Sequence, residues 1–335
     1  MNNDLKYKEA GKFEETRFEK IHNVIFENSN VASLAVAEEI AELIKSKQEA
    51  NQNCVLGLAT GSSPINVYEE LVRMHQEEGL SFKNVITFNL DEYYPMEREN
   101  TQSYWYFMHE HLFNHVDILP ENINIPDGTL KPEEIHQFCI DYELKIKEAG
   151  GLDFQLLGIG RTGHIGFNEP GSHFNSGTRN ITLDHITRID AATAFLGIDH
   201  VPRVAITMGI STIRKAKRIV LMAWGVNKAS VVKDTIEGEI TSEVPATYLQ
   251  RHGNVTFVLD EGASSDLTRI KTPWLVKNCI WTDSLTLKAV VWLSSLLDKS
   301  VLKITDKDYN YNGMASLLVE QGSAYQLNIN MFNKL

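Results

Sequence analysis

The feature that most constrains the fold is a repeated alternation of short apolar runs with helical patterns. Apolar residues recur at helical spacing from Val31 to Lys47, and the short run Val55–Ala59 that follows is typical of a buried strand. Further strand-like runs are Asn84–Leu90, Asp153–Ile159, Val204–Met208, Arg218–Trp224 and Val255–Leu259. Strands that alternate with helices predict an α/β fold of three layers, α/β/α, around a mostly parallel, Rossmann-like sheet.

Changes in patterning along the chain suggest three regions. Residues 1–29 are charged and weakly patterned, so we expect an N-terminal extension there. The strand and helix alternation occupies residues 30–275 and predicts one large domain. Residues 276–335 contain an apolar, aromatic segment followed by polar residues with few strand signals, which predicts a helical C-terminal appendage. The end of the sequence shows no clear signal of a natural stop, which is consistent with a further region in a longer protein.

Composition narrows the class of protein. Apolar residues make up 43% of the 335 residues, enough for a substantial core. The net charge of −12 disfavours nucleic-acid binding and anionic membranes as partners, although it does not exclude a small anionic substrate. Cys54, Cys139 and Cys279 are isolated, which favours a reducing compartment. With neither an apolar signal segment nor a membrane span in the sequence, we expect a cytoplasmic protein.

A glycine- and serine-containing segment, Thr60-Gly61-Ser62-Ser63, lies between a predicted strand and a predicted helix. Backbone N–H groups and hydroxyls at such a point can bind an anion at the helix N-terminus, and Pro64 suits the first helical turn. The segment lacks the GxxxxGK[ST] pattern of a nucleotide-binding P-loop. An ordinary tight turn with a serine cap is the alternative interpretation.

Two carboxylates, Asp91 and Glu92, follow the predicted strand Asn84–Leu90. Ligands of open α/β sheets bind at the carboxyl ends of the strands, so this is a position for functional groups. A carboxylate there can act as a general base, bind a metal or cap a helix. These three interpretations remain open on this segment alone.

The richest segment runs from Gly158 to Pro170 and contains a GxGxxG match, with Asp184 about 20 residues further on. This matches the dinucleotide-binding fingerprint, but that fingerprint requires a helix after its third glycine. Gly166 and Pro170 would break such a helix. The segment is therefore interpreted as a glycine-rich loop that carries His164 and Glu169, a histidine suited to proton transfer and a carboxylate able to orient it.

Other candidates are weaker. Lys228 begins a predicted helix and could bind a phosphate with the helix N–H groups, whereas a solvated surface lysine is the alternative. His111 and His115 have the i, i+4 spacing of zinc ligands, but no HExxH motif is present and apolar neighbours suggest a packed helix, so no metal is expected. A stretch of aromatic residues is interpreted as core packing: Tyr93, Tyr94, Tyr104, Trp105 and Tyr106.

Taken together, four segments over residues 30–275 resemble the glucosamine-6-phosphate deaminase/isomerase family, which is related to the 6-phosphogluconolactonases. They occur in the order of the family: Leu56–Pro64, Val85–Tyr93, Gly163–Gly171 and Gly225–Ala229. The string His-Ile-Gly-Phe-Asn-Glu-Pro within the third segment is specific to the deaminases. The lactonases share the Gly-His element but not typically Asn-Glu-Pro.

The resemblance implies a function and a set of roles. The expected reaction converts glucosamine 6-phosphate to fructose 6-phosphate and ammonia, without a metal or organic cofactor. His164 would open the sugar ring with Glu169 behind it, and Asp91 would move a proton from C2 to C1. Thr60–Ser63 and Lys228 would hold the phosphate. The resemblance also implies oligomers, since the family often forms them, so a homo-oligomer is an expected partner state.

The glycine-rich loop supplies further expected substrate-binding residues, Gly158, Gly160 and Thr162. Thr162 departs from the Asp or Asn of the family and cannot ionise. Thr193 stands where an ungapped count places a phosphate-binding arginine of the family, and Ile181 replaces a lysine of allosterically regulated members. Ile181 argues against activation by an acetylated amino-sugar phosphate. Thr162 and Thr193 motivate one alternative, a related isomerase or lactonase with another substrate, and a sugar-phosphate sensor without catalysis is a second.

Overall fold

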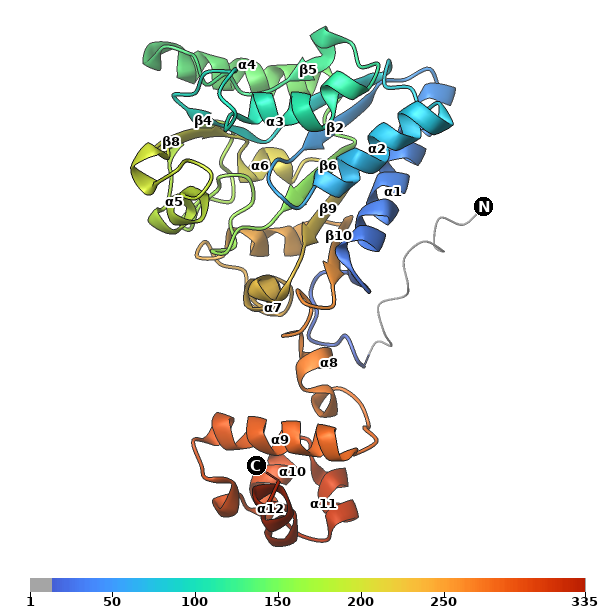
Figure 1. The fold of residues 1–335 in the computed structure, drawn as a ribbon, viewed down its shortest axis with the longest axis vertical. Coiled ribbons are helices and arrows are strands. Elements are labelled where there is room, and N and C mark those ends of the chain that lie inside the picture. The colour runs from blue at the N-terminus through green and yellow to red at the C-terminus, as the bar shows by residue number, and fades with distance from the viewer. Residues whose placement is uncertain (1–13, 335) are drawn as a thin grey trace. The chain divides into compact units, whose positions relative to one another are not determined.

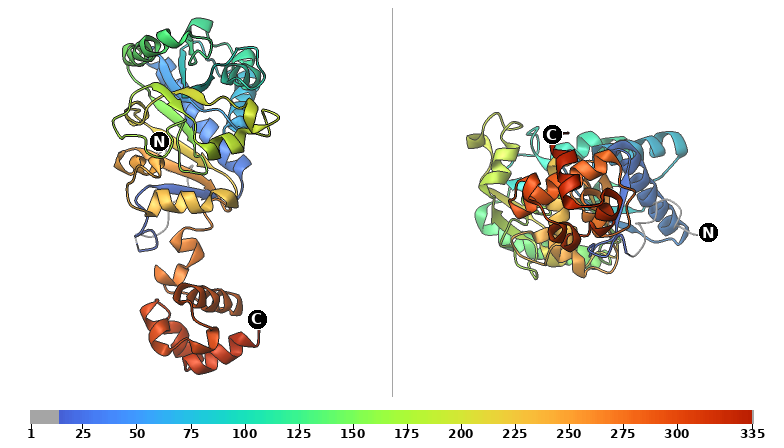
Figure 2. Two further views of the ribbon diagram at one scale, coloured as in Figure 1. Left: turned by 90° about the vertical axis from the view of Figure 1, so that its left-hand side faces the viewer. Right: turned by 90° about the horizontal axis from the view of Figure 1, so that it is seen from below.

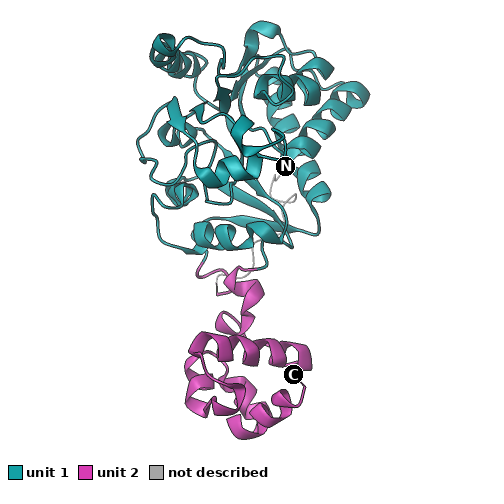
Figure 3. Cartoon of the chain, turned by 60° about the vertical axis from the view of Figure 1, so that its left-hand side comes forward, with its two compact units in different colours: residues 1–10, 19–265 teal, residues 11–18, 266–335 magenta. Residues whose placement is uncertain are grey.

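The computed structural model describes residues 14–334, which form two compact units (Figure 3). Unit 1 comprises residues 19–265, and unit 2 comprises residues 14–18 with 266–334. The domain limit expected at residue 275 lies within unit 2, because Trp274 is already part of the apolar core of that unit.

The centre of unit 1 is a sheet of seven strands (Figure 1). In spatial order they are β1 (Asn23–Phe26), β10 (Val255–Asp260), β9 (Ile219–Ala223), β6 (Phe154–Gly158), β2 (Cys54–Leu58), β3 (Val85–Asn89) and β5 (Ile123–Asn124). Each pair of neighbours is parallel. Strands β2 and β9 are buried at every position, as expected where helices cover both faces of a parallel sheet. The predicted mostly parallel sheet is therefore confirmed.

The first strand was missed by sequence reasoning. The prediction treated residues 1–29 as an extension, but Asn23–Phe26 pairs with β10 at the edge of the main sheet, where Val24 is buried. A run of four residues beside charged ones is too short to stand out as a strand. Residues 1–13 lie outside the described part of the chain.

Helices flank the sheet on both faces (Figures 1 and 2). Those of unit 1 are α1 (Ser29–Glu49), α2 (Ile65–Glu78), α3 (Tyr104–His111), α4 (Ile135–Glu148), α5 (His185–Ala191), α6 (Ile210–Ile213) and α7 (Ala229–Glu237). Ile40, Leu71 and Met108 of the first three helices share one apolar core with Val85 of β3. Because side chains alternate along a strand, Phe88 points to the opposite face, where its ring meets Tyr142 of α4 at a centroid distance of 5.6 Å.

A second, smaller sheet adjoins this arrangement and is antiparallel. Its order is β4 (Asp91–Tyr94), β8 (Val204–Thr207) and β7 (Arg179–Thr182). The run Val204–Met208, which was expected to join the parallel sheet, belongs here instead. Only Leu90 separates β3 from β4, so the chain passes from the large sheet into the small one next to Asp91.

Unit 2 is helical, as predicted for the C-terminal region. It contains α8 (Thr268–Lys271), α9 (Asp283–Leu297), α10 (Asp306–Tyr311), α11 (Ala315–Gln321) and α12 (Ala324–Phe332). Its apolar core includes Trp274 and Leu293. Within the core, the Tyr309 hydroxyl donates to Asn328 Oδ1 at 2.7 Å, and the Asn328 amide donates to the Ile304 carbonyl at 2.7 Å. Within residues 14–334, none of the helices combines the length and the apolar character that crossing a membrane requires.

A buried carboxylate, Asp153, ties several elements of unit 1 together. Its Oδ2 accepts the Val55 N–H of β2 at 3.0 Å, and its Oδ1 lies 2.8 Å from Lys47 Nζ of α1 and 2.7 Å from Lys217 Nζ, just before β9. Burial opposes ionisation, but the two lysines and the N–H group outweigh it and lower the pKa of Asp153.

We expect Asp153→Asn to lower the free energy of unfolding by about 3 kcal/mol at pH 7, because two ammonium groups lose their buried partner. The folded-state pKa is lowered, so the contribution is complete above the unfolded-state value of about 4 and is lost as the pH falls through the lower folded value. Urea denaturation at pH 7 and at pH ~3 measures both effects. The exposed Asp141→Asn serves as the control, and equal stability of Asp153→Asn and the control at pH 7 would contradict the assignment.

Candidate active site

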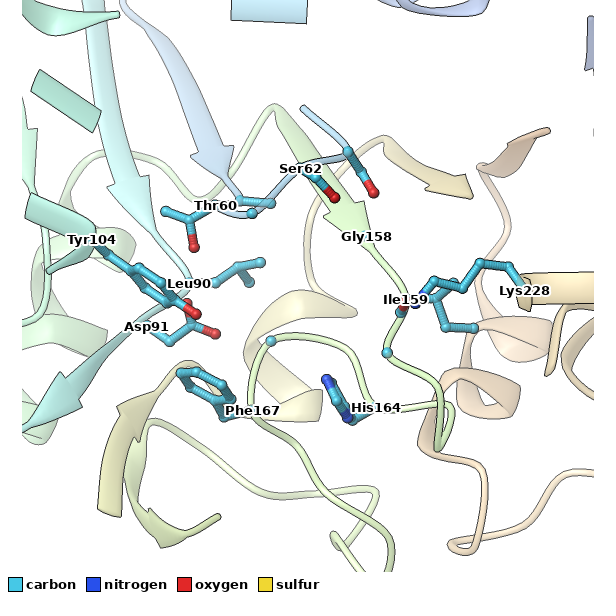
Figure 4. A pocket seen from close by; sticks show the side chains of 15 residues that line it. Thr60, Ser62, Leu90, Asp91, Tyr104, Gly158, Ile159, His164, Phe167 and Lys228 are labelled. Atoms are coloured by element: carbon cyan, nitrogen blue, oxygen red, sulfur yellow. Dashed lines mark hydrogen bonds between the residues drawn. The ribbon is translucent and has the colours of Figure 1, made fainter. Parts of the chain in front are cut away.

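A cavity of about 220 Å³ opens at the carboxyl ends of the central strands of unit 1 (Figure 4). The loops after β2, β3 and β6 contribute to its wall, together with the start of α7. The lining residues predicted from the sequence are Thr60, Gly61, Ser62, Ser63, Asp91, Gly158, Gly160, His164 and Lys228. These candidates, which are far apart in sequence, therefore face a single cavity.

The segment Thr60–Ser63 forms one wall of the cavity, between β2 and α2. Gly61 has φ = +92°, a left-handed conformation that side chains disfavour, and this lets the chain turn sharply at the strand end. The indole N–H of Trp224 donates to the Ser63 carbonyl at 3.1 Å and fixes the loop to the end of β9. The loop presents backbone and hydroxyl groups to the cavity, as an anion requires.

The imidazole of His164 lies directly over Gly160. A Cβ at position 160 would overlap the ring, so any side chain there would require the imidazole or the loop to move. The backbone turns tightly between the two residues, because the Gly160 N–H donates to the His164 carbonyl at 2.9 Å and the Gly163 N–H to the Gly160 carbonyl at 3.0 Å. Glycine at these positions therefore serves the placement of the histidine, in a turn that does not open a helix, as the sequence analysis expected.

Three groups surround Nδ1 of His164. Glu169 Oε2 lies 3.3 Å from it, Thr162 Oγ1 3.0 Å and Thr187 Oγ1 of α5 3.5 Å. The side chains of His164 and Glu169 are only 15% and 10% exposed. Burial opposes ionisation of Glu169, but its interaction with His164 and the N–H of Asp184 lower its pKa. A carboxylate at Nδ1 leaves Nε2 for a ligand in the cavity.

Asp91 reaches the same cavity from the first residue of β4, across the strand pair from Thr207. The backbone of the histidine loop passes close to it: a Cβ on Gly166 would lie 3.2 Å from Asp91 Oδ2 and 3.0 Å from Thr207 Oγ1. Gly166 itself has φ = +55°. The absence of a side chain at Gly166 therefore allows the histidine loop and the aspartate to approach.

The environment of Asp91 favours its neutral form. Its burial, followed by the like charge of Glu92, raises the pKa of Asp91 well above its ordinary value. A buried carboxylate with a raised pKa is suited to take up a proton and return it.

Glu92 has a different role, because its side chain points to the start of α3. Its carboxylate accepts the N–H groups of Tyr93 at 2.9 Å, Tyr104 at 2.9 Å and Trp105 at 3.0 Å. Burial raises the pKa of Glu92 to about 7 although these three donors oppose the shift. Of the interpretations left open for the two carboxylates, helix capping applies to Glu92.

Asn168 connects the histidine loop to the small sheet. Its buried amide donates to the carbonyl of Ile165 and to that of Met208, both at 2.8 Å. Its Oδ1 accepts from Arg179 of β7 at 2.9 Å. These bonds hold the loop that carries His164 and Glu169 against the sheet that carries Asp91.

Lys228 lies at the other end of the cavity from Asp91 (Figure 4). Its Nζ donates to the Ile159 carbonyl at 2.8 Å, which directs the ammonium group toward the glycine-rich loop. Burial lowers the pKa of Lys228. The site thus has a cationic end and an acid–base end.

Some residues differ in place from the sequence interpretation. Glu169 and Thr162 do not line the cavity but stand behind the His164 ring. Tyr104 was assigned to core packing; it does stack on Phe167 at 5.8 Å, but it also lines the cavity. Its place depends on the bond between its N–H and Glu92, for which spacing gives no signal.

Other lining residues that the sequence analysis did not select are Ala59, Leu90, Ile159, Gly166 and Phe167. Thr193 is exposed beyond the end of α5 and does not line the cavity, and Ile181 lies in β7. Residues 14–334 contain no group of three or more His, Cys, Asp or Glu side chains arranged for a metal ion. His111 instead packs against the ring of Phe107, at a centroid distance of 4.4 Å.

Comparisons with known proteins agree on one family. Residues 27–258 match the model described as glucosamine-6-phosphate isomerases/6-phosphogluconolactonase. A glucosamine-6-phosphate deaminase of Mycoplasma mycoides is 46% identical over 74% of this chain and 98% of its own length. A deaminase-like protein of Bacteroides thetaiotaomicron is 50% identical over 96% of this chain, and the chain spans about half, 48%, of that relative.

Solved structures extend the likeness. A monomeric glucosamine-6-phosphate deaminase matches with a TM-score of 0.70 and 41% identity, over 73% of this chain and all of that one. The 6-phosphogluconolactonase of Trypanosoma cruzi matches with a TM-score of 0.60 over 74% of this chain and 97% of its own. Its identity is 20%, so this second match concerns the fold alone.

We expect Gly160→Ala to displace the imidazole of His164, because the added methyl group would occupy the space of the ring. A crystal structure of the variant would show Nδ1 further than the present 3.3 Å from Glu169 Oε2. Gly253→Ala is the control, since a Cβ at that position meets nothing within 4 Å. If the imidazole of His164 kept its position in Gly160→Ala, the prediction would be wrong, and the loop backbone would have moved to accommodate the methyl group.

Proposed function

This chain belongs to the family of glucosamine-6-phosphate isomerases and 6-phosphogluconolactonases, and from that premise we propose that it converts glucosamine 6-phosphate and water to fructose 6-phosphate and ammonia. The observation that carries the proposal is the meeting of Asp91 with the His164–Glu169 pair at one cavity. A proton-transfer set of this kind is what an aldose–ketose conversion needs.

The first step is ring opening. His164 Nε2 faces the substrate, takes the proton of the C1 hydroxyl and returns a proton to the ring oxygen, which leaves C1 as an aldehyde. Glu169, ionised beside Nδ1, stabilises the imidazolium that forms in between. Thr162 and Thr187 help to fix the orientation of the ring through Nδ1.

The second step moves a proton from C2 to C1. The aldehyde makes the C2 proton acidic, and the ionised Asp91 carboxylate removes it to give an enol-like intermediate with the amino group on C2. Asp91 then returns this proton to C1 while the C1 oxygen takes up a proton from water, so that C1 becomes a hydroxymethyl group and C2 an iminium carbon; the extra proton is released with the nitrogen. Water adds to C2 and ammonia leaves, which gives the ketone of fructose 6-phosphate and balances the reaction.

The opposite end of the cavity suits the phosphate. Lys228 lies there with its ammonium group on the Ile159 carbonyl, and Ser62 and Ser63 line the cavity from the neighbouring loop, whereas Thr60 lies on the side of Asp91 and Tyr104 (Figure 4). A phosphate fixed at that end directs C1 and C2 toward Asp91 and His164. The reaction requires no added metal or organic cofactor, because the carbonyl of the substrate itself acidifies C2.

We expect Asp91→Asn to lower kcat by about a thousandfold while glucosamine 6-phosphate still binds, because the amide keeps the shape of the carboxylate but cannot take the C2 proton. Coupled assays of ammonia and fructose 6-phosphate measure turnover, and isothermal titration calorimetry measures binding. Asp141→Asn on the exposed face of α4 is the matched control. Wild-type turnover in Asp91→Asn would remove the aspartate from the mechanism, and binding without turnover in the unmodified protein would favour a sensor.

We also expect kcat/KM to fall with decreasing pH well above pH ~4, where an exposed aspartate titrates. The base must be ionised, and the pKa of Asp91 is raised, so activity is lost as the pH falls through that raised value. Fructose 6-phosphate binding, measured over the same range, corrects for ionisation of the phosphate. If activity persisted down to pH ~4 after this correction, Asp91 would not be the titrating base.

A further inference from the structure

A second basic residue, Arg161, lies next to the cationic end of the cavity but does not line it. It follows Gly160, which lines the cavity, and stands two positions after Ile159, whose carbonyl accepts the Lys228 ammonium at 2.8 Å. The short loop Ile159–Arg161 therefore places a second basic residue beside the part of the cavity wall to which Lys228 donates.

An ion pair fixes one end of this guanidinium. Arg161 Nη2 lies 2.9 Å from Asp190 Oδ1 of α5, and the two side chains are 54% and 46% exposed. A guanidinium carries five N–H donors in a planar fork, so a single contact at Nη2 leaves donors for another acceptor. The half-exposed position allows a ligand to reach them.

Lys228, Arg161 and Asp190 are electrostatically coupled. Burial is the main cause of the lowered pKa of Lys228; Asp190 raises that pKa and Arg161 lowers it further. Both charges therefore act on the ammonium group from nearby. A phosphate monoester carries close to two negative charges at pH 7, more than one partly buried lysine neutralises, and arginine binds phosphate through paired hydrogen bonds.

We propose that Arg161 is a second cationic residue for the substrate phosphate, and that Asp190 holds its guanidinium at the edge of the cavity. This inference rests on the proposed function for the identity of the anion. On binding, the phosphate contacts Lys228 inside the cavity and Arg161 at its rim, while Asp190 keeps one terminal nitrogen of the guanidinium.

A purely structural role makes a different prediction. The Arg161–Asp190 pair joins the glycine-rich loop to α5, and these two elements supply Thr162 and Thr187, both near His164 Nδ1. If the pair only fastened these elements, loss of either partner would disturb His164 equally and lower kcat. If Arg161 binds phosphate, loss of the arginine weakens binding, whereas loss of Asp190 removes a negative charge and does not.

The test compares Arg161→Gln and Asp190→Asn in the full chain. We expect Arg161→Gln to raise KM for glucosamine 6-phosphate by about tenfold or more, with kcat within about twofold, since one charge-assisted contact is lost. Asp190→Asn should leave KM unchanged or lower it. Arg161→Lys should lie between wild type and Arg161→Gln, because it retains the charge but not the fork.

The matched control is Arg98→Gln. It breaks the Arg98–Asp127 pair, which has the same 2.9 Å separation, contains a half-exposed arginine and does not line the cavity. Inorganic phosphate, measured as a competitive inhibitor and by isothermal titration calorimetry, reports binding without turnover. We expect Arg161→Gln to weaken phosphate binding and Arg98→Gln to leave it unchanged.

The outcomes separate the two claims. An unchanged KM and unchanged phosphate binding in Arg161→Gln would overturn the role of Arg161 while leaving the deaminase proposal intact. Equal losses of kcat in Arg161→Gln and Asp190→Asn, with KM unaltered, would also overturn it in favour of the fastening role. If the unmodified protein bound phosphate through Arg161 but did not release ammonia, the anion site would stand and the proposed reaction would fail.

Discussion

The carboxamide of Asn168 joins the histidine loop to the small antiparallel sheet through hydrogen bonds. It bonds the histidine loop to itself through Ile165, to the small sheet through Met208, and to β7 through Arg179. The Asn168 side chain is fully buried and its two amide bonds are shielded from water, while the bond to Arg179 is partly buried, so loss of an amide bond would leave an unpaired polar group. Together with the bond from the Phe167 N–H to Thr207 Oγ1 at 3.0 Å, this amide sets the spacing between the His164–Glu169 pair and Asp91, on which the chemistry that we propose for the cavity depends.

Two glycines make room for the close approach of the histidine loop to its neighbours. At Gly160 the missing side chain makes room for the imidazole, and at Gly166 it lets the loop approach Asp91. The two carboxylates in sequence, Asp91 and Glu92, then separate in function. Asp91 faces the cavity, where burial raises its pKa, whereas Glu92 accepts hydrogen bonds from the N–H groups at the start of α3. Alternation along β4 turns two neighbouring, similar residues toward different tasks.

The architecture and most of the cavity could be predicted because both depend on local patterns. The buried strands β2, β6, β9 and β10 are short apolar runs, and Thr60–Ser63, Asp91 and His164 follow strand ends. The edge strand β1 is too short to show a period, and nothing in the spacing indicates that Val204–Thr207 leaves the parallel sheet for an antiparallel one. Tyr104 was assigned to core packing alone, because its position at the cavity follows from the bond between its N–H and Glu92, which the spacing does not indicate. The roles of the site residues stay predictions.

The passage of the chain from the large sheet into the small one at Leu90 has a geometric consequence. The groups assigned to the phosphate belong to loops of the large sheet, whereas Asp91 belongs to the small sheet. The distance from the proposed phosphate end of the cavity to the Asp91 carboxylate is therefore set by how the two sheets are placed. Under the proposed function, a substrate would present its acidic carbon to Asp91 only if that carbon lay the matching number of bonds from the phosphate, so the placement of two sheets, and not a single contact, would select the length of the substrate.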